Sequence, residues 1–174
     1  MAQPTITYSL DWGNNTAQKL SGKTFTKPDG TVVDCNTVSV TFSSSVSFSK
    51  FYATAVKEGN NYGFYHDATG AAAYDILYDI GLGWPISGSG DPCTVTPTGV
   101  KIYELTSRSG GVNFNFTINA NNHFTSGEGL YRIGLYVQNS SDGTWNYEYF
   151  FITSQDENFE LSTGDLLQVP VITV

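Results

Sequence analysis

Apolar side chains that recur at even positions between residues 38 and 48, with Ser44 as the one even-numbered exception, are the feature that most constrains the fold. The apolar residues fall on even positions, and the odd positions between them hold only serine or threonine; the apolar set is Val38, Val40, Phe42, Val46 and Phe48. Successive side chains of a β-strand point to opposite faces. The segment therefore predicts one strand with an apolar face and a hydroxyl face, and the apolar face needs a second layer to cover it.

The same period of two recurs along much of the chain. Alternating segments are interrupted by turn sequences, of which residues 27–30 (KPDG) and 140–143 (SSDG) are the clearest. Together they predict about nine or ten strands in an all-β, antiparallel two-sheet β-sandwich, immunoglobulin-like or jelly-roll-like. Residues 1–174 are expected to form a single domain. The other predicted strands lie near residues 6–12, 51–56, 74–80, 102–105, 112–118, 131–137, 145–153 and 166–174.

The charge of the chain argues against some partners. Charged residues make up only 14% of the sequence, the net charge is −8, and the eight Lys and Arg residues are scattered. Such a surface repels phosphate backbones, so nucleic acid is not an expected partner. No apolar run is long enough to span a membrane. An extracellular or cell-surface location is expected, although the absence of a leader after Met1 also fits a virion or cytoplasmic protein.

Motifs for catalysis are lacking. His66 and His123 are the only histidines, and no nucleophile, zinc-protease or phosphate-loop motif occurs. We therefore expect no enzymatic activity, no cofactor and no metal. Residues 156–158 (DEN) offer oxygen ligands of the type that calcium prefers, but a solvated loop is the favoured interpretation.

Two cysteines stand 58 positions apart, at Cys35 and Cys93. This spacing fits neither a zinc nor a redox motif. In an oxidising compartment the two could pair, and such a disulfide would stabilise the fold by about 4 kcal/mol in the chain-entropy model. We predict the disulfide, with two free thiols in a reducing compartment as the alternative.

Aromatic residues are abundant, with 11 Tyr, 11 Phe and 3 Trp. Sugar rings present apolar C–H faces and hydroxyls, so aromatic rings beside Asp or Asn side chains are suited to bind them. Trp84 lies in a loop rich in Gly and Pro, and two further aromatic residues flank the 139–142 turn. The predicted ligand-binding residues are Trp84, Asn139, Asp142, Trp145 and Tyr147.

Three segments resemble the subunits and adhesins of chaperone–usher fimbriae. Residues 113–137 (NFNFTINANNHFTSGEGLYRIGLYV) resemble the closing region of these immunoglobulin-like domains, and residues 74–79 (YDILYD) resemble a central strand. The N-terminal alternation of Ile6, Tyr8 and Leu10 is similar to a donor strand. The resemblance covers about a third of the chain, and it implies self-assembly by strand addition.

These observations favour a non-enzymatic surface adhesion or fimbria-like module that binds a host or carbohydrate receptor or a neighbouring subunit. A stand-alone lectin or carbohydrate-binding module is the first alternative. A virion or other self-assembling structural protein is the second.

Overall fold

The computed structural model describes residues 6–58 and 99–159. Several predicted features lie outside these residues: the strands at 74–80 and 166–174, Trp84 with its loop, and Cys93. Within the described residues most of the chain is in β-strands, and one short helix is present. Its elements are β1 (Ile6–Asp11), β2 (Thr24–Thr26), β3 (Val32–Asp34), β4 (Thr37–Ser44), β5 (Phe48–Lys57), β6 (Gly99–Arg108), β7 (Asn113–Asn119), α2 (Ala120–His123), β8 (Gly129–Asn139) and β9 (Trp145–Ser154).

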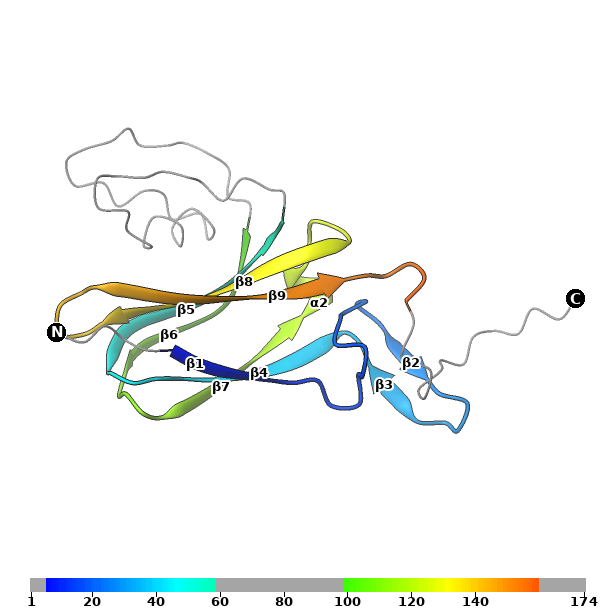
Figure 1. Ribbon diagram of the computed structural model, residues 1–174, viewed down its shortest axis with the longest axis horizontal. Helices are drawn as coiled ribbons and strands as arrows, with labels where there is room; N and C mark the ends of the chain where they lie inside the picture. Colours follow the sequence, from blue (N-terminus) through cyan, green and yellow to red (C-terminus); the bar gives the residue numbers. More distant parts are fainter. Residues whose placement is uncertain (1–5, 59–98, 160–174) are drawn as a thin grey trace, which may run out of the picture.

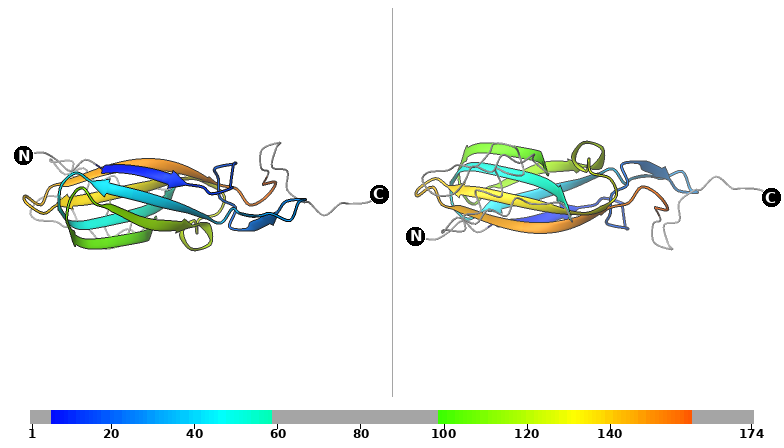
Figure 2. Two further views of the ribbon diagram at one scale, coloured as in Figure 1. Left: turned by 90° about the horizontal axis from the view of Figure 1, so that it is seen from below. Right: turned by 90° about the horizontal axis from the view of Figure 1, so that it is seen from above.

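The strands form two larger antiparallel sheets and one small hairpin. The three-stranded sheet has the order β1-β4-β7, and the four-stranded sheet has the order β6-β5-β8-β9. The two sheets lie one over the other, and the β2–β3 hairpin extends beyond one end of them (Figures 1 and 2). The predicted all-β, antiparallel architecture is therefore confirmed at this level.

A single apolar cluster fills the space between the two larger sheets. Val40, Phe42, Phe116 and Leu135, which alternate with polar residues in the sequence, are at most 6% exposed. Phe42 of β4 stacks on Phe51 of β5 with ring centroids 3.9 Å apart, so the two layers meet ring against ring. Burial of these faces supplies the main stabilisation of the fold.

The predicted continuous strand from 38 to 48 is wrong. β4 ends at Ser44, and β5 begins at Phe48 in the other sheet. The hydroxyl of Ser44 donates to the carbonyl oxygen of Val46 at 2.8 Å, which helps to turn the chain. Phe42 and Phe48 both face the core because it lies between the sheets, so an even-numbered apolar residue points inward on each side of the crossing. Beyond Phe48 a register irregularity in β5 moves the core-facing side chains to odd positions, beginning with Phe51.

The N-terminal strand completes a sheet of its own chain. Ile6, Tyr8 and Leu10, predicted as a donor strand, are paired with Ser44, Phe42 and Val40 of β4. Ile6 is buried in the common core. One chain thus accommodates this strand without a neighbour, and its exchange between chains stays a prediction.

Both predicted turns are present. Gly30 N–H donates to the carbonyl oxygen of Lys27 at 2.9 Å between β2 and β3, and Gly143 N–H donates to that of Asn139 at 2.8 Å between β8 and β9. The region around His123 contains one helical turn, α2. The Asn119 side chain caps this turn by accepting from two backbone N–H groups.

Candidate functional site

The outer face of the four-stranded sheet, which points away from the core, carries a group of aromatic side chains. Residues paired across neighbouring strands share a face, so the register places Glu104, Tyr52, Tyr136 and Tyr147 in one row across β6, β5, β8 and β9. The next rows add further aromatic residues from β9. We call the set formed by Tyr52, Tyr136, Trp145, Tyr147, Tyr149 and Phe151 the aromatic face.

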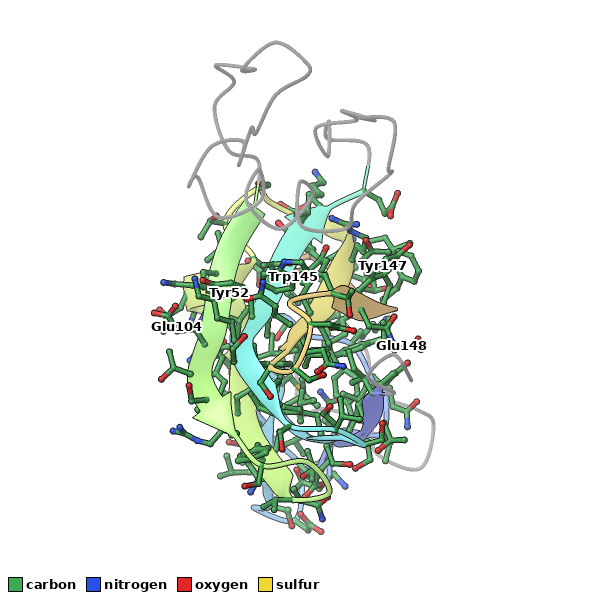
Figure 3. The ribbon with its side chains drawn as sticks, turned by 90° about the vertical axis from the view of Figure 1, so that its left-hand side faces the viewer. Tyr52, Glu104, Trp145, Tyr147 and Glu148 are labelled. Carbon is green, nitrogen blue, oxygen red and sulfur yellow. The ribbon has the colours of Figure 1, made fainter. Side chains whose placement is uncertain are left out.

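The rings of the aromatic face contact one another. Tyr52 and Trp145 are stacked, with centroids 6.0 Å apart and an interplanar angle of 16°, and they lie side by side in Figure 3. The ring centroids of Tyr147 and Tyr149 are 4.9 Å apart. The guanidinium of Arg132 lies 4.4 Å from the centroid of the Tyr149 ring, a cation–π contact. The rings other than that of Phe151 therefore form one packed layer rather than separate side chains.

Exposure differs strongly within this layer. Tyr136 is 0% exposed, whereas Tyr147 and Phe151 are 43% and 51% exposed. Trp145 and Tyr149 are half-buried. Soluble proteins rarely gather exposed aromatic side chains on one face without a binding role, so the accessible rings along β9 are the candidate ligand contacts.

Charged groups border the aromatic face on the side of β6. Glu104 pairs with Lys101 at 3.0 Å, and both side chains are about half-exposed. Lys50 of β5 is exposed. It is paired with Gln138 of β8, which is paired in turn with Trp145 of β9, so the three residues lie in one row across the sheet. These groups, together with the tyrosine hydroxyls, supply hydrogen-bond donors and acceptors around the rings.

Glu148 lies on the opposite side of β9 from the aromatic face. It is paired with Leu135, which is in the core, yet its own side chain is exposed because β9 is an edge strand. Figure 3 shows Glu148 near Tyr147 at the border of the sheet. A charged side chain on the core side of an edge strand discourages another strand from pairing there, because the charge would then have to be buried.

Two of the predicted ligand-binding residues, Trp145 and Tyr147, belong to the aromatic face. Asn139 and Asp142 instead build the β8–β9 turn. Asn139 is 4% exposed, and its side-chain oxygen accepts from the N–H and the hydroxyl of Ser141. The hydroxyl and N–H of Thr144 donate to the Asp142 carboxylate and lower its pKa. Trp84 lies outside the described residues.

Sequence reasoning missed Tyr52, Tyr136 and Tyr149 as members of the same surface. Tyr136 and Tyr149 each alternate with core residues of their own strand, so their outward direction could have been inferred. The sequence could not show that these tyrosines lie beside one another on the sheet. Their proximity depends on the register of β5, β8 and β9, which is set by contacts between residues far apart in the chain.

The outer face of the three-stranded sheet is entirely different. It presents hydroxyls and amides, and neighbouring strands are linked by side-chain hydrogen bonds, Thr7 to Ser43 at 2.9 Å and Thr41 to Asn115 at 2.7 Å. We call this surface the polar face. Its central part forms only a shallow hollow of about 200 Å³, which includes Thr7, Ser43 and Asn113.

A second hollow, of about 240 Å³, lies between the start of α2 and the segments around Glu128 and Asp156. Glu128 already accepts two backbone N–H groups, those of Asp156 and Glu157, each at 2.5 Å. Asp156 pairs with Lys23 at 2.7 Å. Within residues 6–58 and 99–159, no three His, Cys, Asp or Glu side chains come together as metal ligands.

Cys35 is buried in a small cluster with Val33 and Phe159. It is a free thiol in the structure, and burial raises its pKa to about 11, with a further contribution from the charge of Asp34. Its predicted partner Cys93 is outside the described residues, so the disulfide stays a prediction.

Comparison of the chain with protein-family models, with curated proteins and with solved structures finds no match. The described residues also contain no helix long and apolar enough to cross a membrane.

Proposed function

We propose that this protein is a non-enzymatic adhesion module that binds carbohydrate on its aromatic face. The observation that carries the proposal is the column of Trp145, Tyr147, Tyr149 and Phe151, which alternate along β9 on one face of the sheet. Aromatic rings stack on the C–H faces of sugars, and the tyrosine hydroxyls can bond to sugar hydroxyls. The acidic net charge of −8 favours an uncharged ligand over an anionic one.

The shape of the column favours an extended chain over a single sugar. Residues 145 to 151 span about 20 Å at the usual rise of a strand. The accessible rings lie along a sheet surface, so several units of a polymer can contact them in turn. A polysaccharide running along β9 makes use of all four rings.

The strand order allows a finer assignment of the fold. We propose an immunoglobulin-like β-sandwich in which β1, β4, β5, β6, β7, β8 and β9 are the seven successive strands. The first, second and fifth form one sheet, and the third, sixth and seventh lie in the other, as in immunoglobulin domains. The fourth strand, β6, pairs with β5 rather than with β7, which differs from the constant-type arrangement.

Assembly by strand addition is the second candidate. The resemblance to fimbrial subunits motivates it, and the position of β1 at a sheet edge is compatible with exchange. Size-exclusion chromatography with light scattering at several concentrations tests this candidate. A monomer throughout this range would leave carbohydrate adhesion as the better proposal, with an extracellular or cell-surface location.

The test of carbohydrate binding begins with a glycan array and with affinity gels that contain xylan, mixed-linkage β-glucan or galactomannan. We expect the native protein to bind or to be retarded, and Trp145→Ala and Tyr147→Ala to weaken binding about tenfold. Tyr8→Ala is the control for loss of a tyrosine outside the aromatic face: Tyr8 is 38% exposed, close to the 43% of Tyr147, but it lies on the core side of β1, where its ring stacks on Phe150 with centroids 4.7 Å apart. Equal binding by all three variants would contradict the assignment of the surface.

A further inference from the structure

Gly134 lies in the middle of β8, at a point where a side chain has no room. It is paired with Thr54 of β5 and with Tyr149 of β9, so a side chain at this position would point to the aromatic face. A Cβ atom at this position would lie 2.5 Å from Cε2 and 2.8 Å from the hydroxyl oxygen of Tyr136. Both distances are well below van der Waals contact. The Tyr136 ring therefore lies down over the backbone of Gly134 instead of standing up from the sheet.

The backbone itself does not require glycine here. Gly134 is not among the glycines with positive φ, so an ordinary residue could adopt its conformation. Glycine in the interior of a strand also weakens the strand. Among the described residues, the close approach of the Tyr136 ring is the feature that excludes a side chain from this position.

The lowered ring forms the floor of the aromatic face. Tyr136 is fully buried, and its hydroxyl lies 3.4 Å from the hydroxyl of Tyr149. Its ring centroid is 6.1 Å from that of Tyr147 and 5.9 Å from that of Tyr149. The rings of Tyr147 and Tyr149 thus rest against a side chain whose height above the sheet depends on Gly134. Trp145 packs on the cluster that this side chain forms with Tyr52.

We propose that Gly134 is a positioning residue for ligand binding: by leaving space for the Tyr136 ring, it sets the positions of the accessible rings of β9. The effect on binding rests on the function proposed above, whereas the effect on ring positions does not. A methyl group at position 134 lifts the Tyr136 ring and displaces Trp145, Tyr147 and Tyr149 from a common surface.

A double-mutant cycle separates this role from a general effect on stability. Gly134→Ala is made in the native chain, with Tyr136→Val, whose short side chain cannot reach over position 134, and with Tyr136→Phe, which keeps the ring. The protein is labelled with 5-fluorotryptophan, and the ¹⁹F resonance of Trp145 is assigned by its loss in Trp145→Phe. Retardation in the polysaccharide gels described above is measured for the same variants.

We expect Gly134→Ala to shift the Trp145 resonance in the native and Tyr136→Phe backgrounds and to leave it unchanged beside Tyr136→Val. Binding is expected to fall about tenfold with Gly134→Ala in the native chain, with no further fall beside Tyr136→Val. If Tyr136→Val does not fold, Tyr136→Leu takes its place. Shifts of equal size in every background, or no shift in any, would overturn the positioning role.

The two proposals fail in different ways. If the Trp145 resonance follows the cycle but no polysaccharide retards the native protein, the positioning of the rings stands and carbohydrate binding is rejected. If the native protein binds but the cycle is additive, carbohydrate binding stands and Gly134 has no positioning role.

Discussion

The two outer faces of this molecule cover the same core but differ in chemistry. On the polar face, small hydroxyl and amide groups bond to one another across strands, as Thr41 does with Asn115. On the aromatic face, large rings pack into a second layer that buries Tyr52 and Tyr136. The polar face matches the solvated side of an antiparallel sheet. The aromatic face leaves large rings accessible, with Tyr147 43% and Phe151 51% exposed, and is therefore the surface on which the proposed ligand is expected to bind.

The largest expected effect concerns the floor of the aromatic face. Tyr136→Ala removes a fully buried ring and should lower the free energy of unfolding by about 3 kcal/mol. Urea unfolding followed by far-ultraviolet circular dichroism measures the change. A decrease in the free energy of unfolding below about 1 kcal/mol would mean that the rings are not closely packed against one another.

The second prediction concerns the free edge of the sheet that carries the aromatic face. The edge of β9 is blocked near Thr153, whose carbonyl oxygen accepts from Leu20 at 2.9 Å, and near Tyr147, whose N–H donates to the Asn146 side chain at 3.0 Å. Glu148 lies between these blocked points. Glu148→Val should therefore produce dimers or aggregates, because it removes the charge that opposes pairing at an edge.

Light scattering after size-exclusion chromatography gives the mass of the Glu148→Val protein. Glu148→Gln is the matched control, because it keeps the size of the side chain and a polar end. A Glu148→Val protein with the same mass distribution as the native chain would show that the hydrogen bonds at Thr153 and Tyr147 are sufficient to prevent pairing at this edge.

A smaller, pH-dependent effect is expected at the end of the three-stranded sheet. His123 Nδ1 accepts from the Asn119 N–H at 2.9 Å, and burial lowers the pKa of His123. Because the folded state favours the neutral ring, its contribution to stability is complete above the unfolded pKa of about 6.5 and is lost as the pH falls below it. Urea midpoints at pH 7.5 and pH 5 measure this loss.

The variant His123→Gln tests the origin of this pH dependence, because a glutamine carbonyl can accept the same bond without titrating. The difference between the two midpoints should shrink in this variant. An unchanged difference would assign the pH dependence to other groups.

The smallest effect is expected on the polar face. Thr41→Val removes one exposed side-chain hydrogen bond and keeps a β-branched residue in the strand, so the free energy of unfolding should change by less than about 0.5 kcal/mol. Binding in the polysaccharide gels should not change. A binding loss as large as that of Trp145→Ala would reverse the comparison and place the ligand on the polar face.

Much of the fold follows from alternation alone. Val38, Val40 and Phe42 point inward and Ser39 and Thr41 outward, as predicted. The crossing at Ser44 escaped prediction because Val46 and Phe48 resume the period of two after this single interruption. The candidate site was predicted only in part: Trp145 and Tyr147 were found through the neighbouring turn. Tyr52 comes from a strand more than 90 residues earlier, and only the pairing of β5 with β8 brings it near them.

The short crossing between β4 and β5 has a consequence for how the chain folds. Phe42 and Phe51 belong to different sheets but are only nine residues apart in sequence, and their rings are stacked. Closing so small a loop loses little chain entropy. We therefore expect this contact between the layers to form early, as part of a folding nucleus to which β7, β8 and β9 are added later.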